Sequence, residues 1–216
     1  MTQNDLRVVR ETEPDSRLID DLCDIYIESF PPSERVDLRV LAADIVDNRS
    51  WLFTARMAHN LMGFAVTTPL SGTQVHLLEY MAVAKEARSR GIGALLLQSV
   101  SKHAAQSSDN VIGCILEVES DDFGTEDEQL IRKRRIEFYL RNGVLPVTCA
   151  PLYQVPSFAG DDAILPMKLM WLPLNNETGT LSGRKLRDCI CSIYNQSYGL
   201  STDDPFVQSA LNDLTC

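Results

Sequence analysis

Apolar positions in the first part of the chain follow a helical spacing. Residues 5–10 predict a short strand, and a helix then begins near Asp15 and stops at the proline pair that starts with Pro31. The side chains expected on its buried face are Leu18, Ile19, Leu22, Cys23, Tyr26 and Ile27. Ser33 is the expected N-cap of a second helix. Its apolar side chains are Val36, Leu38, Leu41, Ile45 and Val46.

The segments that follow have the pattern of strands. Residues 51–57 and 61–68 predict two strands of a hairpin, with a turn at His59 and Asn60. A third strand over residues 74–83 extends the hairpin into an expected antiparallel meander.

A glycine-bearing turn and an amphipathic helix come next and extend to residue 106. Gly91 and Gly93 stand at the helix entrance, directly after a basic run. The first amide N–H groups of a helix have no partner within the helix and lie at the positive end of its dipole. Such a turn binds anions, and phosphate is the usual one. This segment therefore predicts a phosphate-binding loop.

The second half of the chain continues with strands and helices. Residues 111–118 are almost entirely apolar, as in a strand that is buried on both faces of a parallel pairing. A helix over residues 129–144 closes at an Asn-Gly pair. Two more strands are expected over residues 145–153 and 165–172.

A linker-like segment at residues 175–183 precedes a C-terminal helical segment. We expect a domain over residues 1–174 and a helical extension over residues 175–216. The extension is too short to hold a core alone, so it must pack on the domain or on a partner subunit, as in a homodimer. Its apolar positions are Leu186, Cys189, Ile190, Ile193, Tyr194, Val207, Ala210, Leu211 and Leu214.

The composition and net charge restrict which kinds of protein this chain can be. Hydrophobic residues make up 44% of the chain and charged residues 23%, which are ordinary globular values. The net charge of −10 argues against nucleic-acid binding, because phosphates repel an acidic surface. Without a signal-peptide or membrane-spanning pattern, we expect a soluble cytoplasmic protein. The six cysteines and three histidines form no ligand motif, so no metal is expected, and His76 and His103 are expected on the surface.

Two motifs point to one family. The pattern of a dinucleotide-binding loop fails at Leu96, where a third glycine is required, and a P-loop ending in Gly-Lys-Ser/Thr is absent. The run Arg88-x-x-Gly91-x-Gly93-Ala94 instead resembles the coenzyme A pyrophosphate loop of the GNAT superfamily of acyl-CoA N-acyltransferases. The run from Ile136 to Gly143, which contains Phe138 and Tyr139, is similar to the second signature of that superfamily. It departs from the signature at Val144, where phenylalanine is more usual.

The resemblance extends over residues 5–174 and implies a fold and a cofactor. The fold is α/β, of the α+β kind, with a mixed central sheet of about six or seven strands and flanking helices. The co-substrate is acetyl-CoA, with the backbone of one strand end paired to the pantetheine arm and the amides of the turn on the pyrophosphate. The residues implied in cofactor binding are Met81, Ala82, Val83, Arg88, Ser89, Arg90, Gly91, Ile92, Gly93 and Ala94.

The resemblance also implies catalytic roles. Tyr139 matches the general acid that protonates the departing thiolate, and the alternative is an aromatic packing residue. An ammonium acceptor must lose a proton before it attacks, and Glu79 is the best candidate for the general base. Glu117 and Glu119 are runners-up, and each of the three carboxylates could instead be structural.

The expected activity is direct transfer of an acetyl group to an amine, of a small molecule or a peptide, in a ternary complex. Phe30 and Arg35 belong to the connection that borders the acceptor pocket in this superfamily; alternatively, Phe30 only fills the core behind a proline helix stop. Residues 155–162 form the second expected acceptor loop. A non-catalytic acyl-CoA-binding or regulatory module, and an interaction domain whose loop binds nothing, stay open as other functions.

Overall fold

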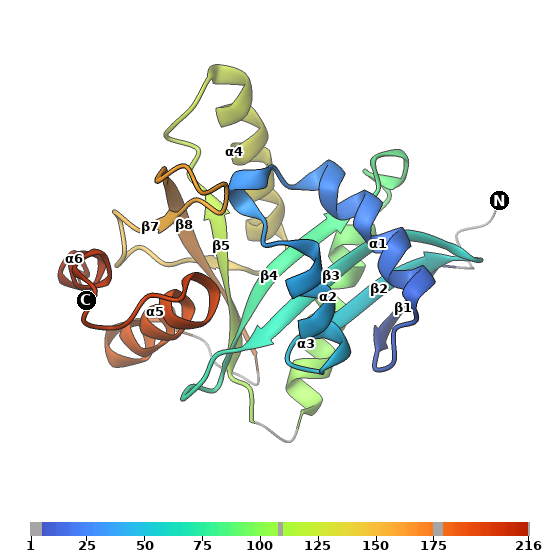
Figure 1. Ribbon diagram of the computed structural model, residues 1–216, viewed down its shortest axis with the longest axis horizontal. Coiled ribbons are helices and arrows are strands. Elements are labelled where there is room, and N and C mark those ends of the chain that lie inside the picture. The colour runs from blue at the N-terminus through green and yellow to red at the C-terminus, as the bar shows by residue number, and fades with distance from the viewer. Residues whose placement is uncertain (1–5, 108–109, 175–178, 216) are drawn as a thin grey trace. The chain divides into compact units, whose positions relative to one another are not determined.

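The computed structural model describes residues 6–107, 110–174 and 179–215 (Figure 1). These residues form eight strands and six α-helices, a mixed α/β fold of the expected class. Two compact units are present. Unit 1 comprises Met1–Thr68 and Leu78–Gln106, and unit 2 comprises Pro69–Leu77 and Ser107–Cys216. Each unit is described by itself.

Unit 1 contains the predicted antiparallel meander. Its strands follow the order β1 (Leu6–Glu11), β2 (Trp51–Met57), β3 (Asn60–Pro69) and β4 (Val75–Val83), and the residues of β4 from Leu78 onward belong to this unit. β1 pairs antiparallel with β2, and β2 pairs antiparallel with β3. The hairpin expected from the alternating pattern is confirmed.

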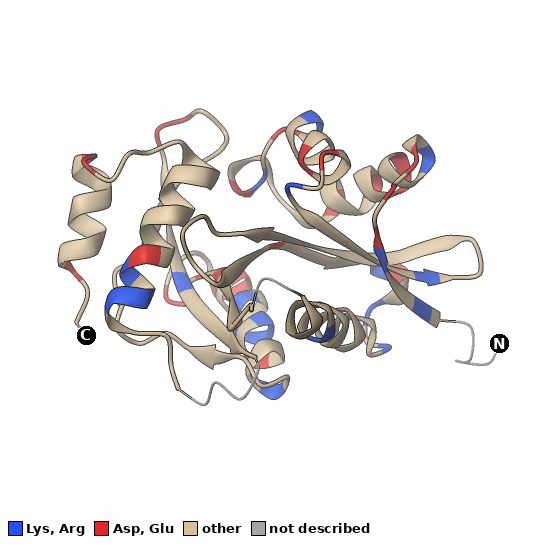
Figure 2. Ribbon diagram, turned by 90° about the horizontal axis from the view of Figure 1, so that it is seen from below, with Lys and Arg blue, Asp and Glu red and all other residues tan. Residues whose placement is uncertain are grey.

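Helices cover both faces of this sheet. Figure 2 shows α1 (Ser16–Ser29) and α2 (Leu38–Val46) on one face and α3 (Ile92–Gln106) on the other, where α3 packs against β1 and β2. The predicted N-cap Ser33 is wrong. Ser33 lies in a 3₁₀ turn, Pro32–Glu34, and α2 begins later because the carboxylate of Asp37 accepts a hydrogen bond from the Arg39 amide at 2.7 Å.

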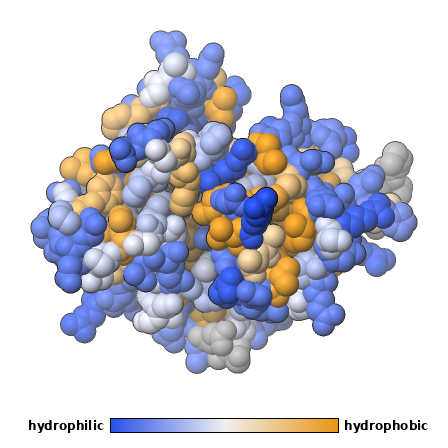
Figure 3. Space-filling model, in the orientation of Figure 1, coloured by the Kyte–Doolittle hydropathy of each residue, from blue (hydrophilic) through white to orange (hydrophobic). Residues whose placement is uncertain are grey.

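Two apolar side chains that we expected inside the core are exposed. Ile27 of α1 and Val46 of α2 are each 54% exposed, and apolar side chains are visible on this surface in Figure 3. Both residues lie at the edge of the apolar stripe of their helix. The helical period therefore identified the buried face correctly but made it too wide.

β8 (Ile164–Pro173) is the central strand of unit 2. It pairs antiparallel with β5 (Gly113–Glu119), β6 (Leu145–Pro146) and β7 (Gln154–Pro156). The strand expected over residues 145–153 is too long, because only Leu145 and Pro146 form β6 there. β7 begins just after this range, at Gln154, and gives one strand more than expected. α4 (Glu126–Arg141) packs against β5 and β6.

The C-terminal helices α5 (Gly183–Tyr198) and α6 (Pro205–Asn212) share one core with the strands of unit 2. Ile115 of β5 and Leu169 and Trp171 of β8 belong to this core. The helical residues in it are Leu186, Cys189, Ile190, Ile193, Tyr194, Val207 and Leu211. Residues 175–178, at the start of the predicted linker, lie outside the described residues, and the boundary after residue 174 stays a prediction.

His76 is buried on β4, only 3% exposed, so the expected surface position is wrong. The neighbouring residues Val75, Leu77 and Leu78 are buried as well, which shows that this part of β4 is covered on both faces. Alternation along a strand separates polar from apolar residues only where one face meets water.

A glycine and a tryptophan determine the packing at the start of β5. The Cβ of any larger residue at Gly113 would overlap the six-membered ring of Trp171, which is 2% exposed. Gly113 pairs with Pro173 in the register of β5 and β8, so Trp171 is its diagonal neighbour on the same face. The absence of a side chain at 113 therefore leaves the space that the indole fills.

We predict that Gly113→Ala lowers the free energy of unfolding by about 1–3 kcal/mol, the usual cost of overpacking a core. Thermal melting measures it, and Gly179→Ala is the control, because a Cβ at Gly179 meets nothing within 4 Å. Adding Trp171→Phe, which shortens the ring system, should recover part of the loss. An unchanged melting temperature in Gly113→Ala would contradict this account of the core.

Candidate functional site

The turn before α3, in unit 1, has the backbone shape of an anion site. It follows a 3₁₀ turn, Lys85–Ala87, and both Ser89 (φ 62°) and Gly91 (φ 79°) adopt left-handed conformations. Successive backbone amides in such a turn can form one concave, anion-binding surface. A serine with positive φ is uncommon, and such strain is concentrated at binding sites.

The amides at the start of α3 add to this surface. Leu95 donates its amide to the Gly91 carbonyl at 3.2 Å, so the amides that precede it lie in the first turn, where a helix offers no acceptor. No acidic residue lies in that turn. Of the residues predicted to bind the cofactor, Arg88, Ser89, Arg90 and Gly91 are exposed, and Ile92 is buried.

Arg88 ties the turn to the end of β4. Its Nε donates a hydrogen bond to the Val83 carbonyl at 3.1 Å. The Ala84 amide donates to the Met62 carbonyl at 2.9 Å, which connects the same strand end to β3. The Arg88 side chain therefore joins the turn to the strand end, and a backbone bond joins the strand end to β3.

Gly63 of β3 is a residue of this region that our sequence interpretation missed. A Cβ at this position would lie 2.6 Å from the Ala82 carbonyl oxygen and 3.1 Å from the Val83 Cα. Only glycine lets β3 approach the end of β4 so closely. An isolated glycine within a strand pattern is the signal that could have identified it.

Glu79 lies on β4 two residues before Met81. Thr68 donates its hydroxyl to Glu79 Oε2 at 2.8 Å, and the Ser50 hydroxyl lies 2.7 Å from the Thr68 hydroxyl. Since the Thr68 hydrogen is used by Glu79, Ser50 is the donor to Thr68. Burial raises the pKa of the Glu79 carboxyl to about 7, the Thr68 hydrogen bond opposes the shift, and the negative charge of Asp44 adds to it.

The two expected acceptor residues also have structural contacts. The ring of Phe30 lies 5.1 Å from that of Tyr80 and 5.5 Å from that of Tyr26. Arg35 Nη1 donates to the carbonyls of Ile27 (2.9 Å) and Phe30 (2.8 Å) at the C-terminal end of α1, where a cation is favoured. Both side chains are half-buried, and both fix the connection between α1 and α2.

The same connection is held at its backbone by two phenols. Tyr26 donates its hydroxyl to the Val36 carbonyl, and the Val36 amide donates to the Tyr80 hydroxyl, each at 3.1 Å. Tyr80 comes directly after Glu79 on β4. The connection that begins at Phe30 is therefore fastened to the strand that carries the candidate base.

Tyr139, in unit 2, is the only residue of α4 classed as buried, with 8% exposure. Burial raises the pKa of its phenol to about 12, and the positive charge of Arg135, one turn earlier, opposes the shift. The phenol therefore stays protonated over the whole physiological range and can donate a hydrogen bond.

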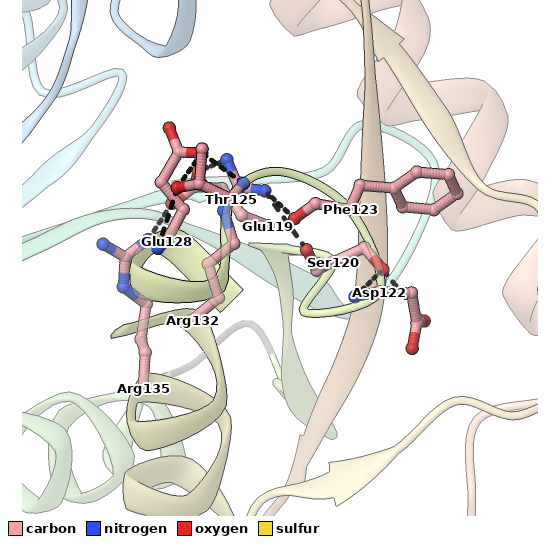
Figure 4. A network of polar contacts seen from close by, with 8 residues as sticks. All are labelled: Glu119, Ser120, Asp122, Phe123, Thr125, Glu128, Arg132 and Arg135. Atoms are coloured by element: carbon pink, nitrogen blue, oxygen red, sulfur yellow. Dashed lines mark hydrogen bonds and ion pairs between the residues drawn. The ribbon is translucent and has the colours of Figure 1, made fainter. Parts of the chain in front are cut away.

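Ion pairs join the end of β5 to the middle of α4, and a capping box lies at the start of the helix, as Figure 4 shows. Glu119, at the end of β5, accepts from Arg132 at 2.8 Å and from Arg135 at 2.6 Å. Thr125 and Glu128 form a capping box at the N-terminus of the helix. Two arginines occupy the Glu119 carboxylate, which is the arrangement of a structural residue.

Glu117 has a different environment. It lies two residues earlier on β5 and accepts hydrogen bonds from the hydroxyls of Tyr153 at 2.6 Å and Tyr198 at 3.1 Å. The three candidate carboxylates are thus distinct: Glu79 accepts from a hydroxyl, Glu117 from two phenols and Glu119 from two guanidinium groups.

Two further observations apply to the described residues only. None of their helices is long and apolar enough to cross a membrane. No three of their histidine, cysteine, aspartate and glutamate side chains lie close enough together to hold a metal ion.

Solved structures share this fold. A protein from Bacteroides thetaiotaomicron, described as a GNAT-family acetyltransferase, has a TM-score of 0.69 at 21% identity and covers 90% of this chain and 99% of its own. An aminoglycoside 6'-N-acetyltransferase complexed with coenzyme A has a TM-score of 0.61 at 18% identity, over 80% and 99%. A Bacillus subtilis acetyltransferase in complex with CoA has a TM-score of 0.53 at 15% identity, over 79% and 99%.

No curated protein sequence matches the chain. The sequence pattern of the acetyltransferase (GNAT) family, however, matches residues 18–128, just over half of the chain. The matched part includes Glu79 and the turn from Arg88 to Ala94, and it ends before Tyr139. The chain therefore belongs to the GNAT family of acetyltransferases.

Proposed function

We propose that the protein is an acetyl-CoA-dependent N-acetyltransferase that transfers the acetyl group directly to an amine. The observation that carries the proposal is the turn before α3, in which left-handed residues at Ser89 and Gly91 lead into amides at the start of a helix. Family membership and the coenzyme A bound to two proteins of the same fold support the pyrophosphate of coenzyme A as the ligand of this turn.

Two backbone segments are proposed to bind two different parts of the cofactor. The strand end of Met81, Ala82 and Val83 pairs with the pantetheine arm, and the amides from Arg88 to Ala94 bind the pyrophosphate. The exposed guanidinium groups of Arg88 and Arg90 add positive charge beside the phosphates.

In the proposed mechanism a neutral amine attacks the thioester carbonyl, the C–S bond breaks, and coenzyme A leaves as a thiol. Glu79, with its pKa near neutrality, takes the proton of the acceptor ammonium. Tyr139 donates a hydrogen bond to the departing sulfur. Phe30 and Arg35 position the connection beside the acceptor.

The raised pKa of Tyr139 refines its role. Burial disfavours the charged phenolate, so complete transfer of the phenol proton to sulfur leaves an unfavourable buried charge. A hydrogen bond that strengthens as negative charge develops on sulfur costs no such transfer. We therefore assign Tyr139 to stabilisation of the thiolate, and the proton can reach the thiol from water.

The direct test is a screen of amines, amino acids, antibiotics and peptides for acetyl-CoA-dependent thiol release, together with calorimetry of acetyl-CoA binding. Binding with thiol release supports the proposal. Binding without acetylation of any acceptor would favour a regulatory acyl-CoA-binding module, and absence of binding would favour an interaction domain.

We predict that Gly91→Ala weakens acetyl-CoA binding about tenfold, because a methyl group on the turn keeps the phosphate from a backbone amide. Calorimetry measures the change. Gly72→Ala is the matched control: Gly72 has φ 74°, close to the 79° of Gly91, and a Cβ meets nothing within 4 Å at either position. If the two variants have similar melting temperatures but different affinities for acetyl-CoA, the turn is identified as the cofactor site. Equal affinities would contradict it.

Tyr139→Phe should lower kcat about 10- to 100-fold and leave the affinity for acetyl-CoA unchanged, because the substitution removes only the hydroxyl. Steady-state kinetics and calorimetry together separate the two effects. The control is Phe138→Leu, because the ring of Phe138 lies 5.3 Å from that of Tyr139. If Tyr139→Phe keeps full turnover at every pH, the residue has no part in the reaction.

We also predict how the rate of acetyl transfer depends on pH. A general base must be ionised, so kcat/KM should rise with pH through about 7, and Glu79→Gln should remove this rise and lower the rate about 100-fold or more. Thr68→Val removes a hydrogen bond that favours the ionised carboxylate, so it should move the inflection to higher pH. A profile that both variants leave unchanged would exclude Glu79 as the base.

A further inference from the structure

Three neighbouring strands of unit 1 each contribute one polar side chain to a row that ends at the candidate base. Ser50 stands directly before β2, Thr68 lies on β3, and Glu79 lies on β4. Trp51 and Thr67 are partners in the register of β2 and β3. The next residues outward, Ser50 and Thr68, therefore stand opposite each other. Their hydroxyls lie 2.7 Å apart, and that of Thr68 lies 2.8 Å from Glu79 Oε2.

The position of Ser50 is set by the corner between α2 and β2. The carbonyl of Asp44, in the last turn of α2, accepts hydrogen bonds from the Ser50 amide at 3.0 Å and from the Arg49 amide at 2.9 Å. Asn48 lies in this corner with a left-handed backbone, φ 56°, which asparagine adopts more readily than most residues. Ser50 is only 3% exposed. Its hydroxyl therefore has a fixed position inside the unit.

The hydrogen bonds of this row have one direction while Glu79 is ionised. A carboxylate only accepts, so the single hydroxyl hydrogen of Thr68 is used on Glu79. Ser50 must then donate to Thr68. A hydroxyl that accepts one hydrogen bond donates a stronger one, because the two bonds polarise each other. Removal of the Ser50 hydroxyl would therefore weaken the bond from Thr68 to the carboxylate without changing Glu79 itself.

Two helices bring titratable groups close to Glu79. The negative charge of Asp44 on α2 adds to the burial that raises the pKa of Glu79 to about 7. On α1, burial and, to a smaller extent, the charge of Glu79 raise the pKa of Tyr26, so this phenol stays neutral. Of the influences on Glu79, the hydrogen bond from Thr68 is the one that favours the ionised form. The strength of that bond therefore matters for a base.

We propose that Ser50 is a positioning residue of the candidate base, which acts through Thr68 to hold Glu79 Oε2 and to keep the carboxylate ionised. The inference rests on the proposed acetyltransferase function and adds a residue to the mechanism of the same site. Ser50 directs the Thr68 hydrogen, and Thr68 directs the carboxylate that takes the proton of the acceptor. That proton moves from nitrogen to Glu79 and does not pass along the row.

The test follows the carboxyl group of Glu79 by carbon-13 NMR in the protein without substrate. Glu79→Gln identifies its signal, and titration gives its pKa. Thr68→Val should raise this pKa by about one, and Ser50→Ala should raise it by about 0.3–0.5, because the first removes the hydrogen bond and the second weakens it. In a protein that already carries Thr68→Val, Ser50→Ala should cause no further change, since Ser50 acts only through Thr68.

Ser101→Ala is the matched control. The Ser101 hydroxyl, on α3 of the same unit, donates to the Leu97 carbonyl at 2.9 Å, so this variant also loses one serine hydrogen bond, and it should leave the pKa of Glu79 unchanged. Ser50→Cys is the second variant: it nearly keeps the shape of the side chain but has only a weak donor, so the pKa should rise here too. An unchanged pKa in both Ser50 variants, or an equal rise with and without Thr68→Val, would overturn the proposal.

Kinetics with an amine from the screen separates positioning from a general loss of structure. Below the midpoint of the pH profile, Ser50→Ala should lower kcat/KM about two- to threefold, because fewer carboxyl groups are ionised, and above it the two rates should converge. A loss that is equal at every pH would indicate a structural defect and overturn the proposal. If no amine is acetylated, the proposed function fails, yet the NMR titration still decides: a raised pKa supports the role of Ser50, and an unchanged pKa refutes it.

Discussion

Strand alternation on β4 is the constraint on which the candidate site of unit 1 depends. One set of side chains, which includes Tyr80, is directed into an aromatic cluster with Tyr26 and Phe30. The other set contains Glu79 and Met81, which remain half-buried. A shift of the register by one residue would exchange the two sets. The same packing that stabilises the unit thus keeps the candidate base on the half-buried side of the strand.

Side chains also alternate along β5 in unit 2, and there the residues of one face have different surroundings. Ile115, Glu117 and Glu119 share one face, and their surroundings change steadily along it. Ile115 belongs to the core, Glu117 accepts from two phenols, and Glu119 is paired with two arginines in the middle of α4. One strand therefore contributes successively to packing, to a hydrogen-bonded cluster of phenols, and to the placement of the helix that carries Tyr139.

The sequence predicted the elements that depend on local signals. The glycine turn before α3, the hairpin of β2 and β3, and the end of α4 at Asn142 all follow from glycine, proline and periodicity, and each is present. Predictions that depended on tertiary contacts were less accurate. His76 is buried because β4 is covered on both faces, and Ile27 is exposed at the edge of the apolar stripe of α1.

In the candidate site, too, local signals could be read from the sequence and tertiary contacts could not. Its motif residues could be identified in the chain, and the isolated glycine in a strand pattern was a usable signal for Gly63. Thr68 and Tyr198 could not be identified, since each acts on a residue that lies farther along the chain or back along it. The close approach at Gly63 depends on how β3 and β4 pair. The phenol of Tyr198 reaches Glu117 only because α5 packs into the core of unit 2. No local pattern contains that information.

The contact between Gly113 and Trp171 restricts the order in which these positions can change during evolution. The indole occupies the volume in which any side chain at 113 would begin, so no single substitution at that position is neutral while Trp171 is present. A lineage can enlarge residue 113 only after a smaller ring has replaced the tryptophan. Relatives with the same packing should therefore vary at the two positions together.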